Sequence, residues 1–204
     1  MIAVVFGIQG VGKSSLVQAV IKEKPDFTLL HWGKYALKVA MEDGLAQDVD
    51  QVRNLPVAVQ KVLQKKVAKI FTDIINGARD KNFIIETHSA LKTQQGFMAG
   101  FTPAILDAVK PDIFFVIESH AIDIYHRRIL DESRKRDHDK TVREIQLNLD
   151  ATRWYATNYS VLSGANLIMV ENVEDNLDIA VTKVTEVLDR FLIDKISLNW
   201  TRLG

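Results

Sequence analysis

The chain has 204 residues, of which 47% are hydrophobic and 25% are charged, as expected for one globular domain, with or without small insertions. Its 26 basic residues equal its 26 acidic ones, so no overall charge favours nucleic acid or an anionic membrane as a partner. The absence of cysteine excludes disulfides, thiolate catalysis and cysteine-bound metals. No apolar run reaches the roughly 20 residues that cross a bilayer, and the start MIAVVFG has no basic signal-peptide segment. We therefore expect a cytoplasmic protein without a membrane or nucleic-acid partner.

Short runs of β-branched and aromatic residues alternate along the chain with longer segments of helical period. Residues 59–74 and 177–191 carry apolar residues at helical spacing. The apolar runs are continuous rather than alternating, which favours strands buried on both faces of a parallel sheet. This order of elements predicts a three-layer α/β sandwich with right-handed crossovers. The predicted strands are 2–6, 28–32, 83–86, 112–118 and 166–171.

The most specific motif is GIQGVGKS at residues 7–14, which fits the phosphate-binding pattern G-x-x-x-x-G-K-[ST]. It follows a predicted strand and opens a predicted helix, as that pattern requires. Its glycines permit the turn that aims backbone N–H groups inward, and the helix N-terminus adds partial positive charge. Lys13 would reach the β- and γ-phosphates, and the Ser14 hydroxyl would ligate Mg²⁺. The alternative is a glycine-rich turn that binds nothing, but the full pattern in this context favours a nucleoside triphosphate site.

The predicted strand 83–86 ends in FIIETHS, which puts Glu86, Thr87, His88 and Ser89 at its carboxyl end. Parallel sheets bind ligands at that edge, where a carboxylate can hold a magnesium-bound water or polarise an acceptor. The alternative for Glu86 is a turn or capping carboxylate, and His88 could equally be a structural hydrogen-bonding residue. The chain has no N-K-x-D segment for reading guanine and no strand ending in adjacent acids, so neither a switch GTPase nor a motor ATPase is indicated.

Arginines and acids crowd the segment YHRRILDESRKRDHD at 125–139. One interpretation is a solvated helix with ion pairs, such as Asp131 with Lys135. The other is a mobile lid whose guanidinium groups stabilise the transferring phosphoryl group and exclude water. Together with the phosphate loop and the acidic strand end, this segment favours a small-molecule kinase. The arginines concerned are Arg127, Arg128, Arg134 and Arg136.

In several ordered blocks the chain resembles the archaeal-type adenylate kinases, a family of P-loop nucleoside monophosphate kinases. The resemblance covers residues 2 to about 192 and rests on VVFGIQGVGKSS, HWGKYALKVA, DVDQVRNLP, ETHSALKT, LDAVKPDIFFVIE, RRILDESRKRD and YSVLSGANL. It implies reversible, Mg²⁺-dependent transfer of the γ-phosphoryl group of ATP to AMP, giving two ADP. It also implies a trimer of chains, each with a three-layer α/β/α P-loop kinase fold on a five-stranded parallel sheet.

The resemblance further implies one kinase domain over 1–192, with a mobile acceptor-binding segment at about 31–75 and an arginine-rich lid at about 126–142. The remaining tail, 193–204, has no clear period and could be a docking tail, a short added strand or a disordered end.

The site residues that the resemblance implies fall into groups by role. Arg53 would clamp the α-phosphate of AMP, Ser14 and Glu86 would hold Mg²⁺, the latter through water, and Arg153 would also face the phosphates. The catalytic group is Lys13, Arg128, Arg134 and Arg136. The ATP-binding group is Gly7, Ile8, Gln9, Gly10, Val11, Gly12, Lys13, Ser14 and Ser15, with Ser163, Gly164 and Ala165 beside the adenine. The AMP-binding group is Gly33, Arg53, Glu86, His88, Ser89 and Lys92.

This sequence departs from the family pattern at three places. Gln9 stands where proline is usual, Glu86 where aspartate is usual, and KTQQGF replaces a common KTPxGY. No departure removes a charge that the chemistry needs. They leave open a kinase of another nucleoside monophosphate or other small acceptor, and a nucleotide-sensing assembly protein with little kinase activity.

Overall fold

The core of the molecule is a five-stranded parallel sheet, as predicted, and its strand order is β2-β3-β1-β6-β7. The computed structural model describes residues 1–93, 95–130, 141–173 and 176–201. Each observed strand lies within one residue of a predicted one at either end. The strands are β1 (Ile2–Phe6), β2 (Phe27–His31), β3 (Asn82–Glu86), β6 (Ile113–Glu118) and β7 (Asn166–Glu171).

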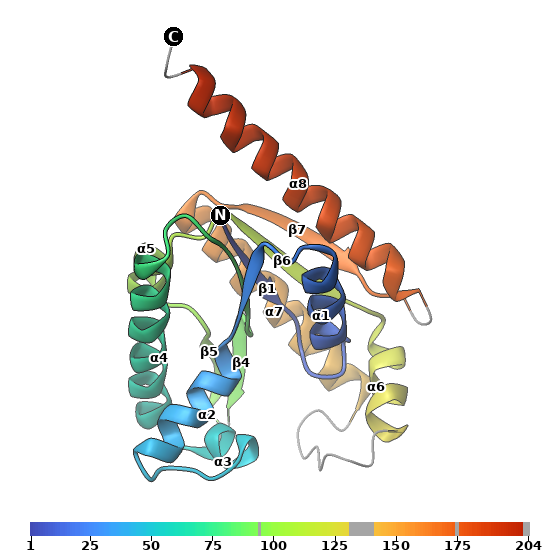
Figure 1. Ribbon diagram of the computed structural model, residues 1–204. Helices are drawn as coiled ribbons and strands as arrows, with labels where there is room; N and C mark the ends of the chain where they lie inside the picture. Colours follow the sequence, from blue (N-terminus) through green and yellow to red (C-terminus); the bar gives the residue numbers. More distant parts are fainter. Residues whose placement is uncertain (94, 131–140, 174–175, 202–204) are drawn as a thin grey trace.

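Helices cover both faces of this sheet, which gives the predicted three layers (Figure 1). Alternate residues of one strand enter different cores: Phe6 belongs to one and Val5 to the other. This is why the strands read as continuous apolar runs. The helices are α1 (Lys13–Glu23), α2 (Trp32–Glu42), α3 (Val49–Asn54), α4 (Val57–Gly77), α5 (Pro103–Val109), α6 (Ala121–Leu130), α7 (Val142–Ser163) and α8 (Leu177–Thr201).

The two cores have different coverings. Helices α2, α4 and α5 and the C-terminal half of α7 pack on the first, which contains stacked and edge-on aromatic rings. Helices α1, α6 and α8 and the first turns of α7 pack on the second. Because both faces are filled, the ligand-binding positions left to this sheet are at its strand ends.

Two features differ from the sequence-based expectations. An antiparallel hairpin of β4 (Ala90–Thr93) and β5 (Gly96–Ala99) follows β3, where no strand was predicted. Helix α8 continues to Thr201, so the added strand considered for the tail is wrong for residues 193–201. In the part of the chain that the structure describes, no helix is both long and apolar enough to cross a membrane.

Candidate active site

The loop between β1 and α1 has the conformation of a phosphate-binding loop. Gly10 and Gly12 have φ of 81° and 86°, in the left-handed region that residues with side chains disfavour. A Cβ on Gly7 would approach the Val11 side chain to 2.9 Å, so this position is also confined to glycine. Helix α1 begins directly after the loop with no side-chain cap, which leaves its first N–H groups available to an anion.

The remaining predicted loop residues divide between the core and the site. The side chains of Ile8 and Val11 are buried in the second core, so they anchor the loop and leave its backbone at the surface. Ser14 and Ser15 lie in the first turn of α1 and are exposed.

Asn172 contacts this loop from a position next to the last strand in the sheet order and holds the loop in place. It follows β7, is only 6% exposed, and its Nδ2 donates to the Val11 carbonyl at 2.8 Å. Its own N–H donates to the Glu118 carbonyl at 2.7 Å, which ties it to the end of β6. A Cβ on Gly12 would collide with the same Nδ2 atom, so the asparagine amide fills the space that the glycine leaves. Asn172 was not predicted as a site residue; the available signal was a polar residue directly after a predicted strand.

Glu86, at the end of β3, joins the loop to the neighbouring strand end. Its Oε1 accepts from Lys13 Nζ at 2.8 Å and from Ser14 Oγ at 2.6 Å. Its Oε2 lies 3.5 Å from Nε2 of His31, at the end of β2. Lys13 and Glu86 are only 8% and 2% exposed, so this is a buried ion pair. The structure thus brings together the two predicted halves of the site and adds His31, which sequence analysis did not single out.

The electrostatics of this cluster keep Glu86 ionised. Burial by itself would raise the pKa of Glu86, but Lys13, the Ser14 hydroxyl and His31 outweigh it, and the net pKa is lowered. Burial lowers the pKa of Lys13, with Glu86 acting in the opposite direction. An ionised carboxylate facing a loop built for phosphates is suited to orient cations there, either the lysine or a metal ion.

Both histidines near Glu86 are held neutral. Burial lowers the pKa of His31 despite the attraction of Glu86. Burial, followed by the positive charges of Lys13 and Arg53, lowers the pKa of His88 to about 3. His88 is also hydrogen-bonded to the backbone of Gly7. It therefore supports the phosphate loop as an uncharged hydrogen-bonding residue, one of the two roles that the sequence left open.

Arg53 brings the acceptor-binding segment against the phosphate loop. It lies in α3, whose N-cap Asp48 accepts from the Gln51 N–H at 2.8 Å. With the Gln9 amide oriented to satisfy its neighbours, its oxygen accepts from both terminal nitrogens of Arg53 at 2.5 Å. Gly33, in the first turn of α2, lies beside the His31 ring.

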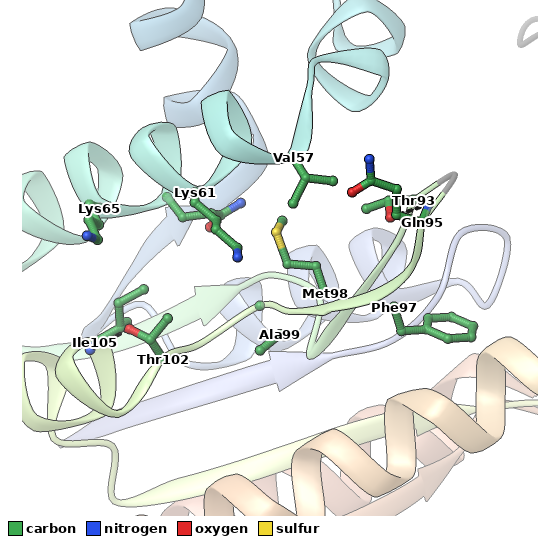
Figure 2. A pocket seen from close by; sticks show the side chains of 12 residues that line it. Val57, Lys61, Lys65, Thr93, Gln95, Phe97, Met98, Ala99, Thr102 and Ile105 are labelled. Atoms are coloured by element: carbon green, nitrogen blue, oxygen red, sulfur yellow. Dashed lines mark hydrogen bonds between the residues drawn. The ribbon is translucent and has the colours of Figure 1, made fainter.

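A hollow opens next to Arg53, between α3, the start of α4 and the hairpin. It has a volume of about 210 Å³ and includes Lys92 in its lining, so two of the predicted acceptor-side cations share it. A larger cavity of about 530 Å³ lies between α4 and the hairpin, and Val57, Thr93 and Gln95 line both spaces. Figure 2 shows Met98 of the hairpin pointing toward Val57 of α4 across this cavity. Neither space was predicted, because the hairpin that forms one wall was not.

The arginine-rich segment is described only in part. Arg128, near the end of α6, donates from Nε and Nη2 to the Gln9 carbonyl at 3.0 and 2.6 Å. A Cβ on Gly10 would come within 3.1 Å of Arg128 Cγ, so this side chain lies directly on the loop. The predicted lid residues Arg134 and Arg136 lie outside the described residues.

Two other predicted site residues, Ser89 and Arg153, lie near the site but bind to other groups of the protein. Ser89 has no exposed surface, and its hydroxyl donates to the Thr152 carbonyl of α7 at 2.8 Å, beneath the site. Arg153, also on α7, forms a two-pronged ion pair with Glu118 and a further one with Asp150 at 3.2 Å. Glu118 ends β6, so Arg153 does lie at the ligand-binding edge of the sheet.

The expected contact of residues 163–165 with the adenine is corrected by the sheet register. Gly164, with φ of 73°, ends α7, and β7 begins at Asn166. Asn166 pairs with Ile113, which pairs with Ala3 at the start of β1. Ser163, Gly164 and Ala165 therefore lie at the edge of the sheet opposite the phosphate loop. In a parallel sheet the segment after β7, which begins with Asn172, is the one that reaches the loop.

A phosphate loop at the carboxyl edge of a parallel sheet, a buried lysine–glutamate pair and arginines from two other segments define a P-loop phosphotransferase. A family model described as an AAA domain matches residues 6–146. An adenylate kinase of Methanothermobacter thermautotrophicus is 35% identical over 188 residues, covering 92% of this chain and 99% of that protein. An adenylate kinase of Methanocaldococcus jannaschii is 32% identical over 191 residues, covering 92% and 97%. The chain belongs to the adenylate kinase family.

A solved structure agrees at the level of the fold. A sugar kinase of a Janibacter species, in its unliganded form, matches with a TM-score of 0.53 and 14% identity, covering 92% of this chain and 94% of that one.

Proposed function

We propose that this protein catalyses the reversible transfer of the γ-phosphoryl group of ATP to AMP, giving two ADP. Family membership supports this reaction. The observation that carries it furthest is the contact at Gln9, where Arg53, predicted to bind the acceptor, reaches the phosphate loop. Transfer between two bound phosphates requires the cations that bind donor and acceptor to lie side by side, which is how Arg53 and the phosphate loop are arranged.

On the donor side, the loop backbone and α1 would hold the ATP phosphates, with Lys13 on the β- and γ-phosphates. Phosphoryl transfer spreads negative charge over the equatorial oxygens, so fixed cations and N–H groups supply most of the catalysis. The side chain of Arg128, from α6, packs against the same loop and could turn from the Gln9 carbonyl to the transferring phosphoryl group. Gly7, Gln9, Gly10, Gly12, Ser14 and Ser15 complete this side of the proposed site.

On the acceptor side, Arg53 and Lys92 would bind the phosphate of AMP, since both border one hollow. The adjoining cavity between α4 and the hairpin has both polar and apolar lining residues, and the apolar ones, which include Val57 and Met98, suit the faces of a purine base. The acceptor phosphate is itself an anionic nucleophile, so no general base is needed.

Ser14 and Glu86 are the residues that would hold Mg²⁺. A hydroxyl and an ionised carboxylate, 2.6 Å apart, fit a hard cation that takes most of its ligands from phosphates and water. No group of three or more metal-binding side chains exists among the described residues, which also agrees with a cation bound mainly through the nucleotide. When bound, Mg²⁺ would neutralise charge on the phosphate oxygens.

The assembly and location follow from the family resemblance. We propose a homotrimer in the cytoplasm. Sedimentation or light scattering should give a mass three times that of the 23.0 kDa chain, and the mass of a single chain would contradict the trimer.

A coupled assay for ADP formation tests the reaction. Purified protein with ATP and Mg²⁺ should form ADP rapidly when AMP is added, and slowly with GMP, CMP, UMP or no acceptor, while dAMP shows whether the sugar is read. A faster reaction with another monophosphate would replace AMP as the acceptor. ATP loss that ignores every acceptor would favour a nucleotide-sensing protein.

A further inference from the structure

Gln9 touches arginines from two distant segments, through different parts of the same residue. Its side-chain oxygen accepts from Arg53 of α3, and its backbone carbonyl accepts from Arg128 of α6. The second contact survives any substitution of the side chain, because the carbonyl belongs to the backbone. The first depends on the amide alone, so mutation can separate the two.

The contact with Arg53 uses a particular edge of the guanidinium group. Both terminal nitrogens, Nη1 and Nη2, point at the single amide oxygen at 2.5 Å. This is an edge through which arginine binds two oxygens of a phosphate or carboxylate at once. Nη1 also approaches Asp50 of the same helix at 3.3 Å. The Gln9 oxygen therefore occupies an edge of Arg53 that is suited to bind a phosphate.

The electrostatics of the neighbouring groups agree with this position of Arg53. Its positive charge contributes to the lowered pKa of Lys13, at the donor phosphates, and to that of His88 beneath the loop. The predicted acceptor-side cation thus lies close to the phosphate loop.

We propose that Gln9 is an internal competitor of the acceptor: its amide oxygen holds Arg53 against the donor loop until the phosphate of AMP replaces it. This inference rests on the proposed role of Arg53 in binding AMP. It assigns to Gln9 a positioning role that sets acceptor affinity, at the place where the family pattern has a proline that could not make this contact.

Competition and simple support predict opposite changes in AMP affinity when the Gln9 amide is removed. If Gln9 merely helped to orient Arg53 for the acceptor, removing the amide would weaken AMP binding. If Gln9 competes, removing it should strengthen AMP binding, since the phosphate no longer has to displace a hydrogen-bonded group. For one charge-assisted hydrogen bond that is partly open to solvent, the expected change is about three- to tenfold.

Steady-state kinetics of five purified variants test the proposal. Gln9→Ala should lower KM for AMP by about three- to tenfold, with KM for ATP changed less than twofold. Gln9→Asn, whose shorter side chain draws the amide back from Arg53, should shift KM for AMP in the same direction. Gln18→Ala, at an exposed glutamine of α1, is the matched control and should change neither constant. In an Arg53→Ala background, Gln9→Ala should have no effect on KM for AMP.

The outcomes distinguish the competition by Gln9 from the proposed role of Arg53 in binding AMP. If Arg53→Ala raises KM for AMP but Gln9→Ala raises it too, or leaves it unchanged, the competition is wrong and the acceptor role of Arg53 stands. If Arg53→Ala leaves KM for AMP unchanged, the acceptor role of Arg53 is wrong, and the competition with it. Calorimetric titration of AMP, without ATP, should give the same order of affinities.

Discussion

The proposed donor and acceptor sides of this site are built in different ways. The donor side is a short continuous segment held between buried strands, with a lysine–glutamate pair that is 8% and 2% exposed. The acceptor side is assembled from α3, α4 and the β4–β5 hairpin around two open hollows. Most of its side chains are partly exposed, and its main link to the donor side is the Gln9–Arg53 contact.

This difference suggests that the two sides contribute to the reaction in different ways. Buried donor groups are fixed before substrate arrives, which is what electrostatic stabilisation of a transition state requires. Acceptor groups on short, exposed elements can rearrange as AMP enters. We therefore expect donor-side changes to reduce turnover and acceptor-side changes to alter acceptor affinity.

The largest effect should come from Lys13→Met. It removes the cation from the transferring phosphates, and kcat should fall on the order of a thousandfold. Circular dichroism should show an unchanged secondary structure, although the uncompensated Glu86 will lower thermal stability. Near-normal turnover would show that the donor loop does not act as proposed.

The second-largest effect should come from Gly12→Ala, because it combines backbone strain with a steric collision. With φ of 86°, the new Cβ would meet the Asn172 amide, and ATP affinity should fall by about a hundredfold. Gly44→Ala is the matched control: its φ is 68°, yet nothing lies within 4 Å of an added Cβ. Titration with ATP should show a loss in the first variant only; equal losses would mean that collision with Asn172 contributes nothing.

A change confined to the acceptor side should separate the two substrates. Val57→Trp would fill space shared by both hollows, so KM for AMP should rise about tenfold while KM for ATP stays within twofold. Initial rates with each substrate varied in turn measure both constants. A parallel rise in the two would place ATP, rather than AMP, in contact with this cavity.

The smallest effect concerns stability and pH. His88 has a pKa of about 3 in the folded protein against an ordinary 6.5, so the unfolded chain binds more protons between these values. The contribution of His88 to stability should be nearly complete above about pH 6.5 and decline as pH falls through the window, with about 2 kcal/mol lost by pH 5.

Denaturant unfolding at several pH values measures this contribution. His88→Gln should flatten the decline, while His126→Gln, at an exposed position, should leave it unchanged. An undiminished decline in the His88 variant would assign it to other groups.

Features whose residues lie close together in the sequence could be predicted, and features that depend on distant segments could not. The loop was predictable because its glycines and Lys13 are neighbours along the chain, and Glu86 because it ends a recognisable apolar strand. The hairpin was missed because its strands are only four residues each and mix polar with apolar residues. Asn172 and His31 were missed because their roles arise only when separate strand ends are brought together in the sheet.

The misplacement of residues 163–165 had a different cause. Their position follows from strand direction: the segment before a parallel strand lies at the edge opposite its ligand-binding end. The resemblance named the segment, but the direction of β7 decides which side of the molecule it occupies. The lysine–glutamate pairing, by contrast, needed only adjacent strands, and β1 and β3 are neighbours in the sheet.

The hydrogen bond from Asn172 to the phosphate loop has a consequence for how the protein is made. The two residues that it joins lie 161 positions apart in the chain, one near the beginning and one after the edge strand β7. A ribosome therefore completes the glycine-rich motif long before it makes the residue that fixes its shape. We expect the newly synthesised chain to gain ATP affinity late, once β7 has joined the sheet, so that nucleotide binding reports the completion of folding.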